Sequence, residues 1–152
     1  MKILDYLHEE TILTDLTATG KKEVIDELSL PLSRLSNIDH RKIAGVLMER
    51  ERLGSTGIGG GIGIPHGKIA ELENLLMGFG ISRKGVKFDA MDGKPVHIFF
   101  LLLSPDDATG LHLMLLARIS RLLKDRRFRE DLEKAMDPKS VMDIIAAADS
   151  EK

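Results

Sequence analysis

The sequence predicts one α/β (α+β) sandwich, in which a mixed sheet of about five strands is flanked by helices on both faces. Apolar residues recur at helical spacing towards both ends of the chain, whereas strand-like segments fill its middle. One of these segments, residues 98–103, is apolar at every position. A strand without a polar face is covered on both sides, so we expect this segment at the centre of the sheet.

The first third of the chain contains a possible strand at 11–13 and two helical patterns. The first pattern covers residues 24–35 and includes Pro31, which should kink or split the helix because proline has no N–H to donate. The second pattern begins at Asp39, a suitable N-cap, and is stopped by Gly54 as its C-cap.

The middle third predicts strands at 75–82, 86–88 and 96–104. Residues 83–85 and 91–94 combine glycine with charged residues, so we expect a turn at each. The strand at 96–104 contains the fully apolar segment and is the expected central strand.

The last third returns to helical spacing. One helix is expected over 111–122 and another over 128–135, and a third begins at Pro138, a residue that suits the first helical turn. Residues 149–152 are expected to fray, as chain ends commonly do. The sequence therefore predicts a single domain over residues 1–148.

Composition excludes several classes of function. The 152 residues include 22 Lys and Arg against 24 Asp and Glu, and the net charge of −2 gives no broad attraction to nucleic acid or anionic membranes. The absence of cysteine excludes disulfides, thiolate metal sites and a cysteine nucleophile. The longest apolar run is too short to cross a bilayer, and the first residues are acidic where a signal peptide would be basic. We expect a cytoplasmic protein that does not insert into membranes.

The most informative segment runs from Gly54 to Gly67, where half of the chain's 14 glycines lie. Glycine allows the backbone to approach a ligand closely. Pro65 fixes its own φ and favours an extended Ile64, so the chain should reach His66 straight and leave it through a flexible Gly67. This arrangement predicts a reactive imidazole that is presented rather than hidden.

Two other interpretations of this segment stay open on the residues alone. A P-loop would need Lys and Ser or Thr after its last glycine, and a dinucleotide loop would need a strand before it and a helix after it; neither context is present. A plain glycine-rich connection with an incidental histidine is the second alternative.

His112 is the second histidine of interest, because it opens an apolar helix after the most buried strand, where open α/β sheets place ligand sites. It could equally be no more than part of a helix start. The chain has neither a G-x-S-x-G elbow for hydrolysis nor a His-rich metal motif. Phosphoryl transfer remains, because it requires mainly a positioned nucleophile and hydrogen-bond donors. Arg50, the hydroxyls of Ser55 and Thr56, and the glycine amides could supply those donors.

At this point the residues resemble the IIA components of the bacterial phosphoenolpyruvate-dependent sugar phosphotransferase system, in the fructose and mannitol group. The nitrogen-regulatory IIA type is the most similar. The resemblance covers nearly the whole chain and depends on four stretches: Arg50-Glu51, Gly54 to Lys68, Phe88 to Gly93 with Pro95-Val96, and His112-Leu113. The departures, Pro31 and the extra glycines Gly60 and Gly61, concern local shape more than chemistry.

The resemblance implies a role for each site residue. His66 would accept a phosphoryl group on Nε2 from the phosphohistidine of a small HPr-like carrier protein, so that the chain is a phosphotransferase in the sense of a transiently phosphorylated phosphocarrier. His112 would help to bind that group, Arg50 would assist with its charge, and Ser55 and Thr56 would line the site. The family fold is a five-stranded mixed sheet flanked by helices. No cofactor and no metal are expected.

Three functions remain possible at this point. A regulatory phosphocarrier of the nitrogen type would change its binding to target proteins with its phosphorylation state. A sugar-transport IIA would pass the group on to a fructose or mannitol IIB domain, and a non-catalytic interaction module would keep a vestigial histidine. No cysteine-type IIB domain and no membrane permease are expected within the chain, which mildly favours regulation.

Overall fold

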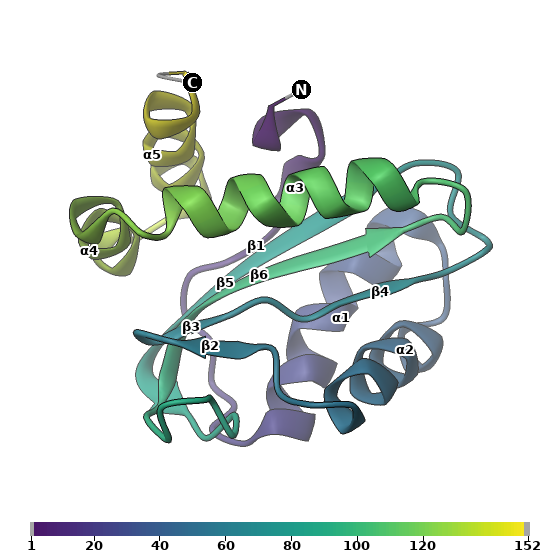
Figure 1. Cartoon of the computed structure of the whole chain (residues 1–152), viewed down its shortest axis with the longest axis horizontal. Helices are drawn as coiled ribbons and strands as arrows, with labels where there is room; N and C mark the ends of the chain where they lie inside the picture. Colours follow the sequence, from purple (N-terminus) through teal and green to yellow (C-terminus); the bar gives the residue numbers. More distant parts are fainter. Residues whose placement is uncertain (1, 151–152) are drawn as a thin grey trace.

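The sheet has six strands, and its order is β1-β5-β6-β3-β2, with β4 also paired to β6 (Figure 1). This computed structural model describes residues 2–150. β1 runs parallel to β5, β5 runs antiparallel to β6, and β3 and β4 both run parallel to β6. The strands are β1 (Leu7–Leu13), β2 (Gly57–Gly59), β3 (Ile62–Gly63), β4 (His66–Lys68), β5 (Leu76–Val86) and β6 (Val96–Ser104).

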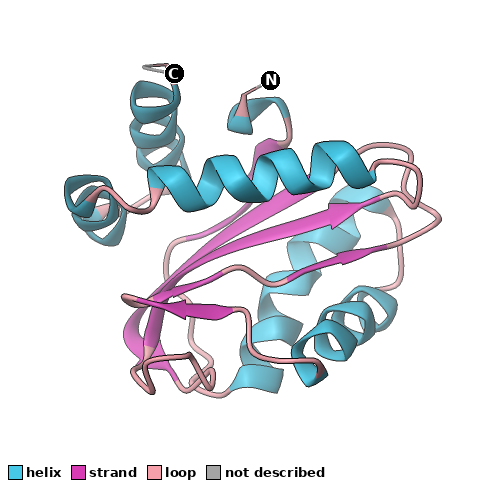
Figure 2. Ribbon diagram, in the orientation of Figure 1, coloured by secondary structure: helices cyan, strands magenta, loops and turns pink. Residues whose placement is uncertain are grey.

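Helices cover both faces of the sheet, as Figure 2 shows. α1 and α2 pack on one face, and α3, α4 and α5 pack on the other. No helix in the described part of the chain is long and apolar enough to cross a membrane. The helices are the short 3-10 helix η1 (Ile3–Asp5), α1 (Lys21–Ser36), α2 (His40–Arg52), α3 (Thr109–Leu122), α4 (Arg126–Lys134) and α5 (Pro138–Asp149).

The central strand β6 separates two hydrophobic cores. Phe100 and Leu102 face the core formed with α3, α4 and α5, whereas Phe99, Leu101 and Leu103 face the core formed with α1 and α2. All five side chains are fully buried. The prediction that this segment forms a central strand covered on both sides is confirmed.

The sheet differs from the expected one in two places. Residues 83–85 do not form a turn: β5 continues to Val86, which pairs with Val96, and the register shifts between Ile81 and Val86. Gly85 has a φ of +92°, so the glycine that indicated a turn instead allows a β-bulge. The glycine-rich segment adds the short strands β2, β3 and β4 and brings the total to six.

The first long helix is not split by Pro31. α1 continues through it to Ser36, and the Pro31 ring is buried in the core. Of the expected kink or split, the split does not occur, because burial of the ring offsets the one backbone hydrogen bond that proline cannot make.

The ends of α2 follow the sequence signals closely. Asp39 is the N-cap, and its side chain accepts a hydrogen bond from the Arg41 amide. The C-cap is Leu53, one residue before the expected position, and Gly54 follows with a positive φ of 142°. A glycine just beyond the last turn is the usual way to end a helix.

Asp149, which we expected to fray together with residues 150–152, is ordered instead. Asp149 is the last residue of α5 and is buried, with an ion pair to Arg118 and a hydrogen bond of 2.8 Å from the Ile3 amide. A buried carboxylate with these partners is held in place rather than free to fray. Residues 151–152 lie outside the described residues.

Candidate functional site

His66 stands on a short strand that is fixed from both sides. It is the first residue of β4 and pairs with Leu102 of the central strand β6. The Leu102 amide donates to the Pro65 carbonyl at 3.1 Å, and the Ile64 amide donates to the Thr56 carbonyl at 3.0 Å. The Pro65 segment is therefore the rigid support for His66 that the sequence predicts.

Gly67 serves this support by its small size. A Cβ at Gly67 would lie 2.5 Å from Val46 Cγ1, so glycine lets α2 pack directly against β4. We expected Gly67 to provide flexibility after the histidine. That expectation was wrong, because the residue is paired with Leu103 inside the sheet.

The tautomer of His66 follows from its one hydrogen bond. Nδ1 lies 2.8 Å from the Ile64 carbonyl oxygen, which can only accept a hydrogen bond. Nδ1 therefore carries the proton, and Nε2 carries the lone pair. His66 is half-buried, and its Nε2 has no protein partner within residues 2–150.

His112 lies beside His66, as the sequence suggested. The two rings have their centroids 5.4 Å apart and are inclined by 61°. His112 belongs to the start of α3 and is 5% exposed, and its Nδ1 is 2.6 Å from Ser104 Oγ at the end of β6. Every fully buried side-chain nitrogen and oxygen of the described residues has a hydrogen-bond partner. Since His112 Nε2 has none, this atom reaches the surface next to His66.

Both imidazoles are held in the neutral form. Burial lowers the pKa of His112 to about 4, and the positive charges of a protonated His66 and of Lys68 act in the same direction. Burial also lowers the pKa of His66, helped by Arg50 and opposed by the Ile64 hydrogen bond and by Glu51. A neutral imidazole keeps its lone pair at neutral pH and can act as a nucleophile.

Arg50 stands at the C-terminal end of α2, close enough to influence the pKa of His66. Its Nη1 donates to the Gly54 carbonyl at 2.9 Å, and its side chain is only partly buried. Arg52 behaves differently: it is exposed and pairs with Glu49. Of the two arginines, Arg50 is the one whose charge acts on His66.

The hydroxyls of Ser55 and Thr56 are used inside the loop. Ser55 Oγ donates to the Phe88 carbonyl at 2.8 Å and accepts from the Gly57 amide at 3.0 Å. Thr56 Oγ1 donates to Glu51 and is buried. Each hydroxyl has only one proton and already donates it within the loop. We expected these hydroxyls to donate to a phosphoryl group, but neither is free to do so.

Sequence reasoning missed the group that holds this loop. Glu51 is 5% exposed, and its carboxylate accepts hydrogen bonds from the Thr56 amide and hydroxyl and forms an ion pair of 3.2 Å with Lys21. Lys21 Nζ also lies 4.9 Å from the centre of the Phe88 ring. The Arg50-Glu51 pair was the available signal, but nothing in the sequence indicated that Glu51 points inward to Lys21.

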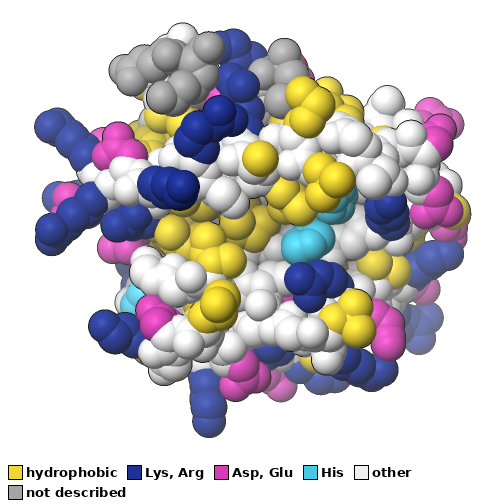
Figure 3. Space-filling view, in the orientation of Figure 1, with side chains coloured by type: hydrophobic (Ala, Val, Ile, Leu, Met, Phe, Trp, Pro, Cys, Tyr) yellow, Lys and Arg dark blue, Asp and Glu magenta, His cyan; other side chains and the backbone are white. Residues whose placement is uncertain are grey.

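Exposed apolar side chains lie near the histidine pair. Figure 3 shows hydrophobic groups on more than one side of the two central histidine side chains, together with basic groups. In the sequence, Leu113 and Met114 follow His112 directly, and they are 59% and 57% exposed. Ile58 and Met91 lie on the glycine-rich side, where the Met91 amide donates to the Gly57 carbonyl. We call these four residues the apolar rim.

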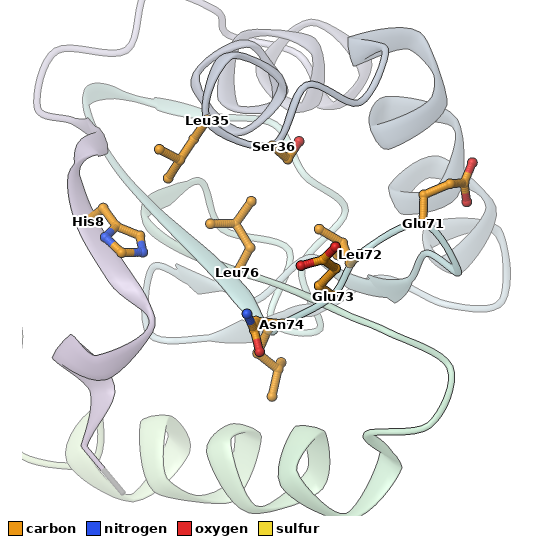
Figure 4. Close-up of a pocket in the computed structure, with 9 residues that line it drawn as sticks. His8, Leu35, Ser36, Glu71, Leu72, Glu73, Asn74 and Leu76 are labelled. Carbon is orange, nitrogen blue, oxygen red and sulfur yellow. The ribbon is translucent and has the colours of Figure 1, made fainter.

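Five surface cavities of the described residues do not include the histidine pair. A cavity of about 340 Å³ is found elsewhere, between β1, the end of α1 and the loop before β5 (Figure 4). His8, Leu35, Ser36 and residues 71–76 line it. This cavity holds none of the residues that the sequence singled out. The candidate site is therefore an open surface around His66 and His112.

The chain is similar to known proteins in both sequence and fold. The family model described as "Phosphoenolpyruvate-dependent sugar phosphotransferase system, EIIA 2" matches residues 5–148. A nitrogen regulatory protein of Bradyrhizobium diazoefficiens is 38% identical over 96% of this chain and 95% of its own length. The fructose-specific EIIABC component of Bacillus subtilis is 36% identical over 95% of this chain, which corresponds to 23% of that protein.

A solved structure agrees with these relatives. The crystal structure of the nitrogen regulatory protein IIA-Ntr from Neisseria meningitidis matches with a TM-score of 0.88 and 37% identity, over 93% of this chain and 97% of that one. Fold, length and sequence thus point the same way. The chain belongs to the EIIA type 2 family of the phosphoenolpyruvate-dependent sugar phosphotransferase system, whose members are phosphotransfer proteins.

Proposed function

We propose that this chain is a histidine phosphocarrier that receives a phosphoryl group on Nε2 of His66 and acts in regulation of the nitrogen type. One observation carries the assignment: the hydrogen bond from His66 Nδ1 to the Ile64 carbonyl leaves Nε2 as the nucleophilic nitrogen, next to a second neutral histidine. Phosphoryl transfer needs a nucleophile in line and donors for the phosphoryl oxygens.

The transfer step involves one bond made and one bond broken. His66 Nε2 attacks the phosphorus of a donor phosphohistidine, the new N–P bond forms, and the donor N–P bond breaks with its electron pair left on the donor ring. Positive charge develops on the His66 ring. The Ile64 carbonyl accepts a hydrogen bond from His66 Nδ1–H during the whole step and so stabilises that charge.

The surrounding groups have distinct roles in this proposal. We assign His112, whose ring lies beside His66, to binding of the phosphoryl oxygens, and Arg50, whose charge acts on His66, to supplying positive charge. Ser55 and Thr56 hold the loop through their side-chain hydrogen bonds and do not contact the phosphoryl group with their hydroxyls. No cofactor or metal takes part in the proposed step.

The donor is proposed to be an HPr-like phosphocarrier protein. Transfer between two histidines requires two protein surfaces to meet, and an open site with an apolar rim of Ile58, Met91, Leu113 and Met114 suits such contact better than a deep pocket does. The contact is expected to be small and transient.

Sugar transport is the second candidate, because relatives of both kinds match this chain. The nitrogen regulatory relative matches along nearly its whole length. A fructose-specific EIIA component of Haloferax volcanii, however, is 36% identical over 83% of its own length. In the second candidate function, phosphorylated His66 would pass the group to a fructose or mannitol IIB partner.

The test is to incubate the protein with phosphoenolpyruvate, enzyme I and an HPr-like carrier, and to measure intact mass. We expect an acid-labile phosphoryl adduct that maps to His66 and that is absent when enzyme I is left out. No adduct with competent donors would leave the non-catalytic interaction module instead. Loss of the label on addition of a fructose IIB domain would favour sugar transport over regulation.

A further inference from the structure

Ser104 is a buried polar residue whose side chain touches the site from behind. It is the last residue of β6 and is 0% exposed. Its backbone carbonyl accepts from the Ile69 amide at 2.9 Å, which anchors the chain just after β4. Its hydroxyl lies 2.6 Å from His112 Nδ1, and this is the only hydrogen bond that the hydroxyl makes to residues 2–150.

We propose that Ser104 is a positioning residue that donates its hydroxyl proton to His112 Nδ1 and so fixes His112 as an Nε2–H donor towards the phosphoryl group. The assignment of the His112 tautomer concerns the unphosphorylated protein alone. The role of His112 towards the phosphoryl group rests on the proposed function of His66. The role differs from that of Ser55 and Thr56, whose hydroxyls are bound within the loop.

The direction of the hydrogen bond follows from the number of acceptors. If His112 Nδ1 carried the proton, it would donate to Ser104 Oγ, and the buried hydroxyl proton would find no acceptor in the described part of the chain. A buried donor without an acceptor loses its hydration and gains nothing in return. If Ser104 donates, its proton is satisfied, and the remaining proton of the neutral imidazole sits on Nε2, which reaches the surface.

The two histidines then have opposite tautomers. His66 carries its proton on Nδ1 because a carbonyl faces that atom, and His112 carries its proton on Nε2 because a hydroxyl proton faces its Nδ1. The result is one lone pair and one N–H at neighbouring rings whose centroids are 5.4 Å apart. A nucleophile and a donor to a phosphoryl oxygen are what an incoming phosphoryl group requires, and no proton has to move between the two rings during transfer.

The main experiment is ¹⁵N NMR of the histidine rings in the unphosphorylated protein at neutral pH, where ring correlations identify the tautomer. In the wild type we expect the Nε2–H tautomer for His112 and the Nδ1–H tautomer for His66. Ser104→Ala should convert His112 to a mixture or to the Nδ1–H tautomer and leave His66 unchanged. Ser104→Thr keeps the hydroxyl and should restore the wild-type pattern.

The second readout is the initial rate of phosphoryl labelling from the HPr-like carrier. We expect Ser104→Ala to label about tenfold more slowly, which is the effect of losing one modest hydrogen bond in a transition state. Ser29→Ala is the matched control, because Ser29 is equally buried but bonds to the Ile25 carbonyl within α1. It should change neither the tautomers nor the labelling rate.

The outcomes separate this proposal from the proposed function. An Nδ1–H tautomer for His112 in the wild type would overturn the role of Ser104, and this measurement needs no variant to fold. An unchanged His112 tautomer in Ser104→Ala would do the same, as would a shifted tautomer with an unchanged labelling rate. A wild type that never labels would refute the phosphocarrier function, while the tautomer spectra would still decide whether Ser104 sets the His112 proton.

Discussion

The open surface around His66 and His112 can be compared with the cavity beside His8. The cavity is a partly open hollow of about 340 Å³, its histidine has no partner imidazole among residues 2–150, and its Glu71 pairs with Lys42 on the exposed surface. The histidine pair combines fixed tautomers, a nearby cation and an apolar rim. A protein that exchanges a small group with another protein needs positioned atoms at its surface, because the partner supplies the other half of the enclosure.

The largest expected difference between the two regions is in phosphoryl labelling. His66→Ala removes the nucleophile, so the labelling rate should fall by more than about a thousandfold, to background. His8→Ala should label like the wild type. Intact-mass analysis after incubation with the donor proteins measures both. Normal labelling of His66→Ala would place the acceptor elsewhere, and loss of labelling in His8→Ala would make the cavity part of the mechanism.

The second difference concerns the glutamates of the two regions. Glu51→Gln leaves Lys21 without its buried counter-charge and weakens the support of the Thr56 loop, so the free energy of unfolding should fall by about 3 kcal/mol. Urea denaturation measures this change, and the labelling rate should fall as well.

Glu71→Gln is the control for that prediction. Glu71 is exposed and its partner Lys42 is exposed too, so this variant should unfold like the wild type. If both glutamate variants had the same stability, the ion pair between Glu51 and Lys21 would not be what holds the loop.

The third prediction uses the pH dependence of stability. The pKa of His112 is about 4 in the folded protein, below its ordinary value of 6.5. Well above pH 6.5 the ring is neutral in both the folded and the unfolded protein, so its full contribution to stability is present. As the pH falls from 6.5 towards 4, the unfolded chain binds a proton that the folded protein does not, so stability decreases. Because of this histidine, the free energy of unfolding should be about 2 kcal/mol lower at pH 5 than at pH 7.5.

The measurement compares urea denaturation at pH 7.5 and pH 5 for the wild type and His112→Gln. The variant should lose less stability than the wild type over this interval. A wild type and a His112→Gln variant with equal losses would mean that the His112 environment does not exclude the charged ring.

The smallest expected effect separates two arginines near the site. Arg50→Lys keeps the charge but loses the planar set of donors, so labelling should slow by about tenfold. Arg52→Lys should have no effect on labelling, because Arg52 is exposed and pairs with Glu49. Initial labelling rates measure both. An equal loss in the two variants would show that only the total charge at the end of α2 matters.

Much of the fold follows from periodicity along the chain. The run 98–103 identifies the central strand because its burial on both faces is visible in the sequence, and Asp39 marks the start of α2 by a local hydrogen bond. Gly85 could not be interpreted in the same way. Turns and β-bulges both use positive φ, and only the pairing of Val86 with Val96 decides between them.

The site residues also fall into two groups: those that local sequence identifies and those whose partners are distant in sequence. His66 could be identified because proline and glycine around it constrain the backbone locally, and the structure brings His112 and Arg50 to it. The partners of Ser55 and Thr56 could not be identified, because a hydroxyl type does not indicate its acceptor. Those acceptors are the Phe88 carbonyl, which is distant in sequence, and Glu51, whose inward direction depends on Lys21.

The contacts of Asp149 determine where the two ends of the fold leave the molecule. Asp149 holds the Ile3 amide with its side chain, accepts from Lys2 with its carbonyl, and pairs with Arg118 on the helix that carries His112. Both ends therefore emerge side by side (Figure 1). A domain with adjacent ends can be inserted into a loop of another protein, or tethered at either end, with the same geometry. A partner tethered there would stay at high effective concentration near the same surface of the phosphocarrier, whichever end of the domain was used.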